Sequence, residues 1–213
     1  MTSADAPRPT FLRHHPVTLT FVLALLIVGL ATGSAWRGAP RAVIHAAGFR
    51  PSDALALDLG RLFGAAWFTT GPGSLVQALL LTALGVGLLE RRLSSAWAAL
   101  AFLGLHALAF LSLALLYVLP GMGGLVRNAR DVGASAGYFG ALALALGMTP
   151  RWRWLVPAFA VATALSWLGT ATTNGAPGRI VNAAAEHLFT IVYGGGAGWL
   201  LGMSARDRAK RGP

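Results

Sequence analysis

The chain carries a serine and a histidine whose surroundings suggest shared chemistry. Ser135 stands between Gly133 and Gly137 at the start of an apolar stretch, and a lone His187 lies 52 residues further on, inside a second apolar stretch. A hydroxyl beside an imidazole base is the arrangement that nucleophilic catalysis requires. Because both stretches are long enough to enter a bilayer, this pattern predicts hydrolysis inside a membrane.

The composition is that of an all-α membrane protein. Hydrophobic residues make up 55% of the 213 residues and charged residues 11%. Apolar runs of roughly 16 to 24 residues recur, close to the ~20 needed to cross the hydrocarbon core. We expect six transmembrane helices, over residues 17–35, 74–89, 96–119, 132–148, 152–171 and 180–203. Strand alternation is absent, so helices remain the way to satisfy backbone polar groups in lipid.

These segments divide the chain into an N-terminal tail (1–15), a six-helix membrane domain (16–203) and a basic C-terminal tail (204–213). The first segment also resembles a cleavable signal peptide, but the five segments that follow favour a retained helix. Ten basic residues lie at one set of helix ends and seven at the other. Most of the seven fall in one long loop, so we expect a multi-pass protein of the inner membrane with both termini in the cytoplasm.

The net charge of +10 is spread over short loops and tails. It favours contact with the anionic headgroups of a lipid bilayer over nucleic acid, since no basic run is interleaved with aromatics on a soluble domain. The long loop, residues 38–73, holds apolar pieces too short to span a membrane. We expect them in the outer interface, with Trp67 at headgroup level and Arg61 reaching water.

Helix geometry places the serine and the histidine at similar depths. Ser135 lies about 6 Å and His187 about 10 Å below the outer surface of a ~30 Å core. His106 lies nearer the midplane, and we interpret it as a structural residue that faces the bundle interior. Glu186 stands about 100° round the helix from His187, so it is not expected to orient that imidazole, and a dyad is predicted rather than a triad.

The face of the last apolar segment that carries the histidine is lined with small residues. Its members are His187, Thr190, Gly194, Gly198 and Gly202. Small residues at this spacing let two helix backbones approach closely in lipid. We therefore expect Ser135 to face this segment, with its Oγ atom within about 4 Å of a ring nitrogen of His187.

Residues 133–140, Gly-Ala-Ser-Ala-Gly-Tyr-Phe-Gly, resemble the active-site motif of rhomboid intramembrane serine proteases. His187, followed by Thr190 and Gly194, resembles the histidine of that family with its trailing small residues. The resemblance implies a six-helix bundle, a Ser135–His187 dyad, no metal or organic cofactor, and substrates that are transmembrane helices of other membrane proteins. It also implies that a few residues pack the active site: Gly133, Ala136, Gly137, Phe139, whose ring would lie on the histidine, and Gly194.

The chain departs from the family pattern in two places. The family has glycine directly after the serine, where this chain has Ala136. Members often carry a histidine on the second helix, with an asparagine four residues on, that stabilises the oxyanion. Here the plausible registers give Ser74 with Ala78, or Gln77 with Leu81. Loss of one oxyanion donor costs on the order of 10²–10³ in rate.

Ser74, Gln77 and the backbone amide of Ser135 are the candidate oxyanion donors that remain. The alternative is a catalytically inactive rhomboid-like protein that binds transmembrane helices. A small transporter is less favoured, because neither paired intramembrane carboxylates nor broken repeats are evident.

Overall fold

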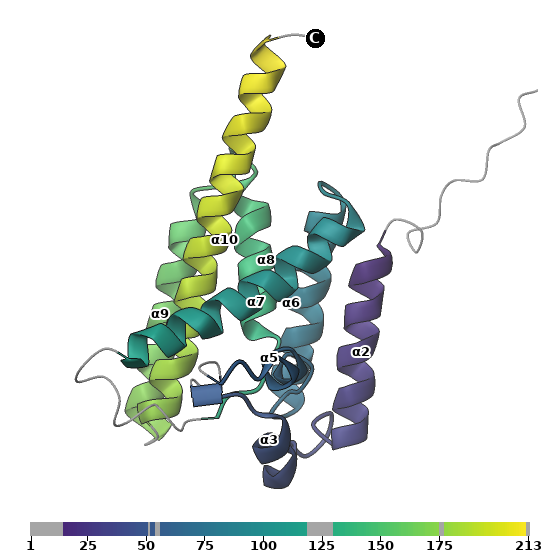
Figure 1. Ribbon diagram of the computed structural model, residues 1–213, viewed down its shortest axis with the longest axis vertical. Helices are drawn as coiled ribbons and strands as arrows, with labels where there is room; N and C mark the ends of the chain where they lie inside the picture. Colours follow the sequence, from purple (N-terminus) through teal and green to yellow (C-terminus); the bar gives the residue numbers. More distant parts are fainter. Residues whose placement is uncertain (1–14, 51, 54–55, 119–129, 175–176, 212–213) are drawn as a thin grey trace, which may run out of the picture.

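The computed structural model describes residues 15–50, 52–53, 56–118, 130–174 and 177–211. Each of the six predicted apolar segments is helical, and two short helices lie in the long loop (Figure 1). The helices are α2 (Pro16–Thr32), α3 (Arg41–Ala47), α5 (Leu59–Ala65), α6 (Pro72–Glu90), α7 (Ser95–Val118), α8 (Ser135–Gly147), α9 (Leu155–Asn174) and α10 (Pro177–Arg211). The expected N-terminal tail lies outside the described residues except for His15, and the expected C-terminal tail continues α10 as far as Arg211.

Three of these helices are long and apolar enough to cross a membrane by length and composition, over Pro72–Glu90, Ser95–Leu116 and Val181–Arg206. Helices α2, α8 and α9 contribute shorter apolar stretches. The chain is therefore an all-helical membrane protein within the part that the structure describes. Helix α8 is shorter than the predicted segment 132–148, because residues 132–134 lead into it as an extended turn and the helix begins only at Ser135.

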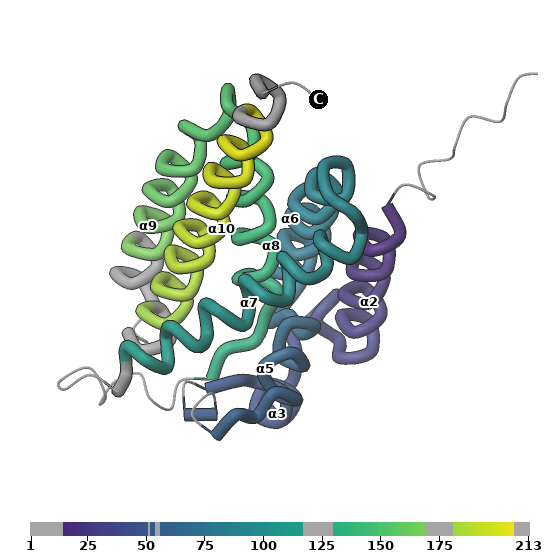
Figure 2. The backbone as a smooth tube through the Cα atoms, turned by 45° about the horizontal axis from the view of Figure 1, so that its top comes forward, coloured from purple at the N-terminus to yellow at the C-terminus, as the bar shows by residue number. Residues whose placement is uncertain are grey.

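Helix α8 occupies the centre of the bundle, with α10, α7 and α6 around it and α2 on the far side of α6 (Figures 1 and 2). Every residue from 136 to 145 is buried. Such a helix needs small residues wherever a neighbour comes close. At Gly137 a Cβ atom would lie 2.7 Å from the ring of Phe102 on α7.

The predicted small-residue face of α10 packs directly on α8. A Cβ atom added at Gly194 would overlap the carbonyl oxygen of Gly140, and one at Gly198 would overlap that of Leu144. Further along, a Cβ at Gly202 would lie 3.0 Å from the carbonyl oxygen of Met148, directly after α8. The two backbones therefore touch over several turns, as the spacing of the glycines predicts.

A carboxylate at the end of α6 caps the N-terminus of α2. Glu90 accepts hydrogen bonds from the amides of Thr18 (2.8 Å) and Val17 (3.0 Å) and from the Thr18 hydroxyl (2.5 Å). The first amides of a helix have no partner inside the helix, and a negative charge there is favoured by the helix dipole. Glu90 thereby joins the start of α2 to the end of α6.

The long loop packs against α7 through α5. Trp67 packs edge-on against Phe21 of α2, with ring centroids 5.1 Å apart, and stacks near Phe102 at 6.5 Å. The half-buried ring of Trp67 therefore packs between α2 and α7, and its expected place at headgroup level stays a prediction. His106 is fully buried, and its Nε2 lies 2.9 Å from the carbonyl oxygen of Leu62 in α5, which confirms a structural position.

Ion pairs fix the shape of this loop. Arg50 donates to the buried carboxylate of Asp53 at 2.8 Å, and Arg61 pairs with Asp58 at 3.2 Å and approaches Asp53 at 3.8 Å. Burial alone would raise the pKa of Asp53, but the hydrogen bonds from Arg50 and the charge of Arg61 outweigh burial and hold this pKa below its usual value. The side chain of Arg61 thus forms ion pairs within the loop as well as reaching water.

Helix α10 offers a matched pair of glycines that tests the close approach. Gly194→Ala should lower the free energy of unfolding by about 1–3 kcal/mol, because its methyl group meets the α8 backbone. Gly196→Ala, whose methyl group meets nothing within 4 Å, should be neutral or stabilising by about 0.5–1 kcal/mol. Thermal unfolding of the two purified variants checks this, and equal melting temperatures would show that α8 and α10 do not pack through Gly194.

Candidate active site

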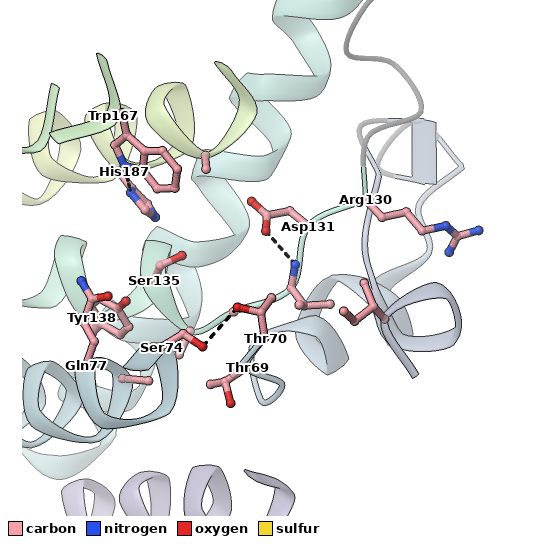
Figure 3. Close-up of a pocket in the computed structure, with 16 residues that line it drawn as sticks. Thr69, Thr70, Ser74, Gln77, Arg130, Asp131, Ser135, Tyr138, Trp167 and His187 are labelled. Carbon is pink, nitrogen blue, oxygen red and sulfur yellow. Dashed lines mark hydrogen bonds between the residues drawn. The ribbon is translucent and has the colours of Figure 1, made fainter. Parts of the chain in front are cut away.

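A cavity of about 550 Å³ opens where the first turns of α6, α8 and α10 meet the long loop. Five of the predicted site residues line it: Ser74, Gln77, Gly133, Ser135 and His187. Figure 3 shows Ser135 and His187 reaching it from opposite sides, from α8 and α10. The structure thus brings together side chains that lie up to 113 residues apart in the sequence.

A tight backbone path places the serine at the very start of α8. Gly133 has a φ of 150°, a conformation that other residues rarely adopt, and its amide donates to the carbonyl of Ala65 at 3.0 Å. Ala136 follows the serine and is fully buried, so a larger residue there would collide with its surroundings. Gly133, Ala136 and Gly137 therefore form the packed support of Ser135.

Two aromatic rings enclose the imidazole of His187, which is only 5% exposed. The ring of Phe139 lies against it with centroids 4.5 Å apart, and this confirms the predicted contact. Trp167 of α9 donates its indole N–H to His187 Nδ1 at 2.9 Å. Sequence reasoning did not identify Trp167, because one tryptophan on a separate apolar helix carries no spacing signal toward the histidine.

This indole hydrogen bond determines where the imidazole carries its hydrogen. Since Nδ1 accepts from Trp167, the ring hydrogen must reside on Nε2. His187 Nε2 is buried and has no hydrogen-bond partner; in Figure 3 it is the ring nitrogen on the side of Ser135. No hydrogen bond joins the Ser135 hydroxyl to a ring nitrogen of His187, and the approach within about 4 Å stays a prediction. His187 presents an N–H group to the cavity.

Two acidic residues lie near the serine. Glu186 is 1% exposed, whereas Asp131 lines the cavity. Asp131 precedes α8 and is held beside Phe49 by an isolated bridge.

The prediction that Glu186 does not orient the imidazole is confirmed. His187 Nδ1 accepts from Trp167 and His187 Nε2 has no hydrogen-bond partner, so no carboxylate is bonded to the ring.

The candidate oxyanion donors differ in whether they already form hydrogen bonds within the protein. The Ser74 hydroxyl accepts from the Gly71 amide at 2.9 Å and donates to the Gly71 carbonyl at 2.8 Å, so it caps the start of α6. Gln77 is exposed and lines the cavity. Gln77 and the amide of Ser135 are therefore better placed than Ser74 to meet a developing negative charge.

The chain matches no family model, no curated protein and no solved structure. No group of three or more histidine, aspartate or glutamate side chains able to hold a metal ion lies within the part of the chain that the structure describes. A function is therefore inferred from the geometry of the cavity and the side chains around it, which are those of Ser135, Glu186, Asp131, His187 and Trp167.

Trp167→Phe should change the tautomer of His187. Without the indole N–H, nothing holds Nδ1 in the accepting state, so the ring hydrogen should populate Nδ1 as well as Nε2. Nitrogen-15 NMR of histidine-labelled protein, assigned with His187→Gln, measures this directly, and Trp199→Phe on the exposed side of α10 is the control. A wild-type spectrum with the hydrogen already on Nδ1 would contradict the hydrogen bond from Trp167.

Proposed function

We propose that this protein is a rhomboid-type intramembrane serine endopeptidase that cleaves transmembrane helices of other membrane proteins near the outer face of the cell membrane. In this proposal all six apolar helices cross the membrane and both termini lie in the cytoplasm. The observation that carries it is one cavity, inside an apolar bundle, that holds both the Ser135 hydroxyl and a buried, unpaired ring nitrogen of His187. Ser135 is the nucleophile and His187 is its partner.

The position of Ser135 favours attack on a carbonyl group. As the first residue of α8, its amide belongs to the set that has no partner inside the helix, and it lies at the positive end of the helix dipole. A tetrahedral intermediate formed on Oγ would place its oxyanion near this end. Preorganised donors of this kind supply much of the catalysis in acyl transfer.

The cavity also suits a hydrolytic reaction. Its wall includes the hydroxyl side chains of Thr69, Thr70 and Ser74 and the carboxamide of Gln77 (Figure 3). These groups give water a path to an acyl-enzyme inside an otherwise apolar bundle. A substrate segment that enters must lose its helical structure there, since a peptide carbonyl is open to attack only when its backbone is accessible.

The second candidate is a catalytically inactive member of the same kind that binds transmembrane helices. One observation favours it: α6 offers Ser74 and buried Ala78 at the positions where the family has a histidine and an asparagine, and Ser74 already caps its helix. Both candidates use the same cavity. They differ in whether Ser135 reacts.

Reaction with a serine-directed fluorophosphonate separates the two. The wild-type protein should be labelled, Ser135→Ala should not, and His187→Ala should be labelled at least about 10²-fold more slowly, because a buried partner of the reaction is lost. Ser112→Ala, a serine of α7 bonded to Tyr193 on α10, is the control and should label normally. Complete lack of wild-type labelling, with no cleavage of a reporter helix, would favour the helix-binding protein.

Gln77 provides a separate test of the oxyanion site. Gln77→Leu should lower reporter cleavage by about 10²-fold with the melting temperature unchanged, because one donor to the oxyanion is removed. Gln77→His should keep or raise activity by restoring a donor. Val76→Ala alters an exposed neighbour on α6 and serves as the control. Cleavage by Gln77→Leu at the wild-type rate would remove Gln77 from the mechanism.

A further inference from the structure

The wall of the cavity holds a hydrogen-bond donor that lacks an acceptor. His187 Nε2 carries the ring hydrogen, because Nδ1 accepts the indole N–H of Trp167 at 2.9 Å. The imidazole is 5% exposed and lines the cavity, and within the part of the chain that the structure describes no protein group bonds to Nε2. A buried N–H group without an acceptor is unfavourable, so a ligand that accepts from it is stabilised there.

The start of α8 faces the same space. Its N-cap residue is Ala134, whose methyl side chain cannot accept from the first amides of the helix, and both Ala134 and Ser135 line the cavity. The first amides of a helix have no partner inside it, and they lie at the positive end of the helix dipole. Figure 3 shows His187 and Ser135 on opposite sides of this space. Two independent features, the helix start and the Nε2–H group, therefore favour an acceptor with negative charge.

The charged side chains of the cavity limit how much negative charge it takes. Arg130 lines the cavity, and its guanidinium donates to two backbone carbonyls of the long loop. Asp131 lines it too, with one carboxylate oxygen accepting from the Val132 amide at 2.8 Å (Figure 3). Glu186 is 1% exposed and is outside the lining. Because Asp131 opposes each added negative charge, a singly charged ligand is favoured over a doubly charged phosphate.

The cavity is also larger than a lone carboxylate. Its volume is about 550 Å³, within the range of sites that hold small organic ligands. Its wall includes the carboxamide of Gln77, which both donates and accepts hydrogen bonds and so matches a peptide group. Hydroxyl groups of Thr69, Thr70 and Ser74 lie along the same wall. These groups suit a carboxylate that is carried by a peptide.

We propose that this cavity binds the carboxylate at the C-terminal end of a peptide, whose oxygens accept from His187 Nε2–H and from the start of α8. The inference goes beyond the proposed function, because binding needs no reaction at Ser135. In an endopeptidase the ligand class includes the new C-terminus that cleavage leaves, so one product would compete with the substrate for the cavity.

A pair of matched probes tests the site in the full-length protein in detergent micelles. N-acetylalanine carries a carboxylate, and N-acetylalaninamide has nearly the same shape without the charge. We expect N-acetylalanine to shift the Nε2–H signal of His187 in nitrogen-15 NMR, with saturation and a Kd on the order of 10 mM. The amide should bind at least about tenfold more weakly. Equal shifts with the acid and the amide at matched ionic strength would overturn the proposal.

Thermal unfolding tests the donor by mutation. At about ten times the Kd, N-acetylalanine should raise the melting temperature of the wild-type protein by about 3–5 °C. His187→Phe keeps an aromatic ring but has no N–H group, so it should lose this rise. His45→Phe, the same change at an exposed histidine of α3, is the control and should respond as the wild type does.

An equal rise in folded His187→Phe would show that the carboxylate binds elsewhere and would overturn the proposal. Should His187→Phe fail to fold, the NMR comparison of acid and amide on the wild-type protein decides alone. Sodium acetate identifies the source of the carboxylate. Tighter binding of N-acetylalanine than of acetate indicates a peptide end and equal binding indicates a free carboxylate; both support the anion site.

This proposal and the endopeptidase proposal fail separately. Binding of N-acetylalanine by a wild-type protein that neither reacts with fluorophosphonate nor cleaves a reporter helix would overturn the endopeptidase and leave the carboxylate site in place. Labelling at Ser135 without any difference between the acid and the amide would overturn the carboxylate site, and the endopeptidase proposal would stand.

Discussion

The contact between the glycine faces of α8 and α10 is the constraint on which the cavity depends. Lipid supplies no hydrophobic force between apolar helices, so close packing has to come from backbone approach and van der Waals contact. Gly194 and Gly198 permit it, since a Cβ atom at either would overlap a carbonyl oxygen of α8. These two contacts fix how α10 lies along α8. As a result, the turn of α10 that holds residues 186 and 187 lies near the start of α8.

A second constraint comes from the amides at helix starts, which have no partner inside the helix and find little water in a bilayer. Glu90 meets this need at the start of α2, where it accepts from the amides of Val17 and Thr18. The start of α8, where Ser135 lies, instead borders the cavity.

The hydrogen bond from Trp167 connects α9 to this chemistry. A histidine ring presents either a lone pair or an N–H group to a given neighbour, and the other ring nitrogen decides which. The hydrogen bond from Trp167 to Nδ1 selects the tautomer with an N–H group at Nε2. Trp167 belongs to α9, and it is the residue of that helix that lines the cavity within the part of the chain that the structure describes. The charge distribution around Ser135 therefore depends on where α9 sits, although the serine lies on α8 and the histidine on α10.

The sequence by itself determined the six helical segments, the common cavity of Ser135 and His187, the glycine face of α10 and the ring of Phe139 on the histidine. These features follow from segment length and helical periodicity, which are local properties of the chain. Only the tertiary structure decided that Trp67 packs against Phe21 and Phe102, that Trp167 fixes the tautomer of His187, and that Asp131 forms a bridge with Phe49. Each of these depends on a contact between separate elements, and no periodicity within one segment encodes which atom of a distant side chain arrives there.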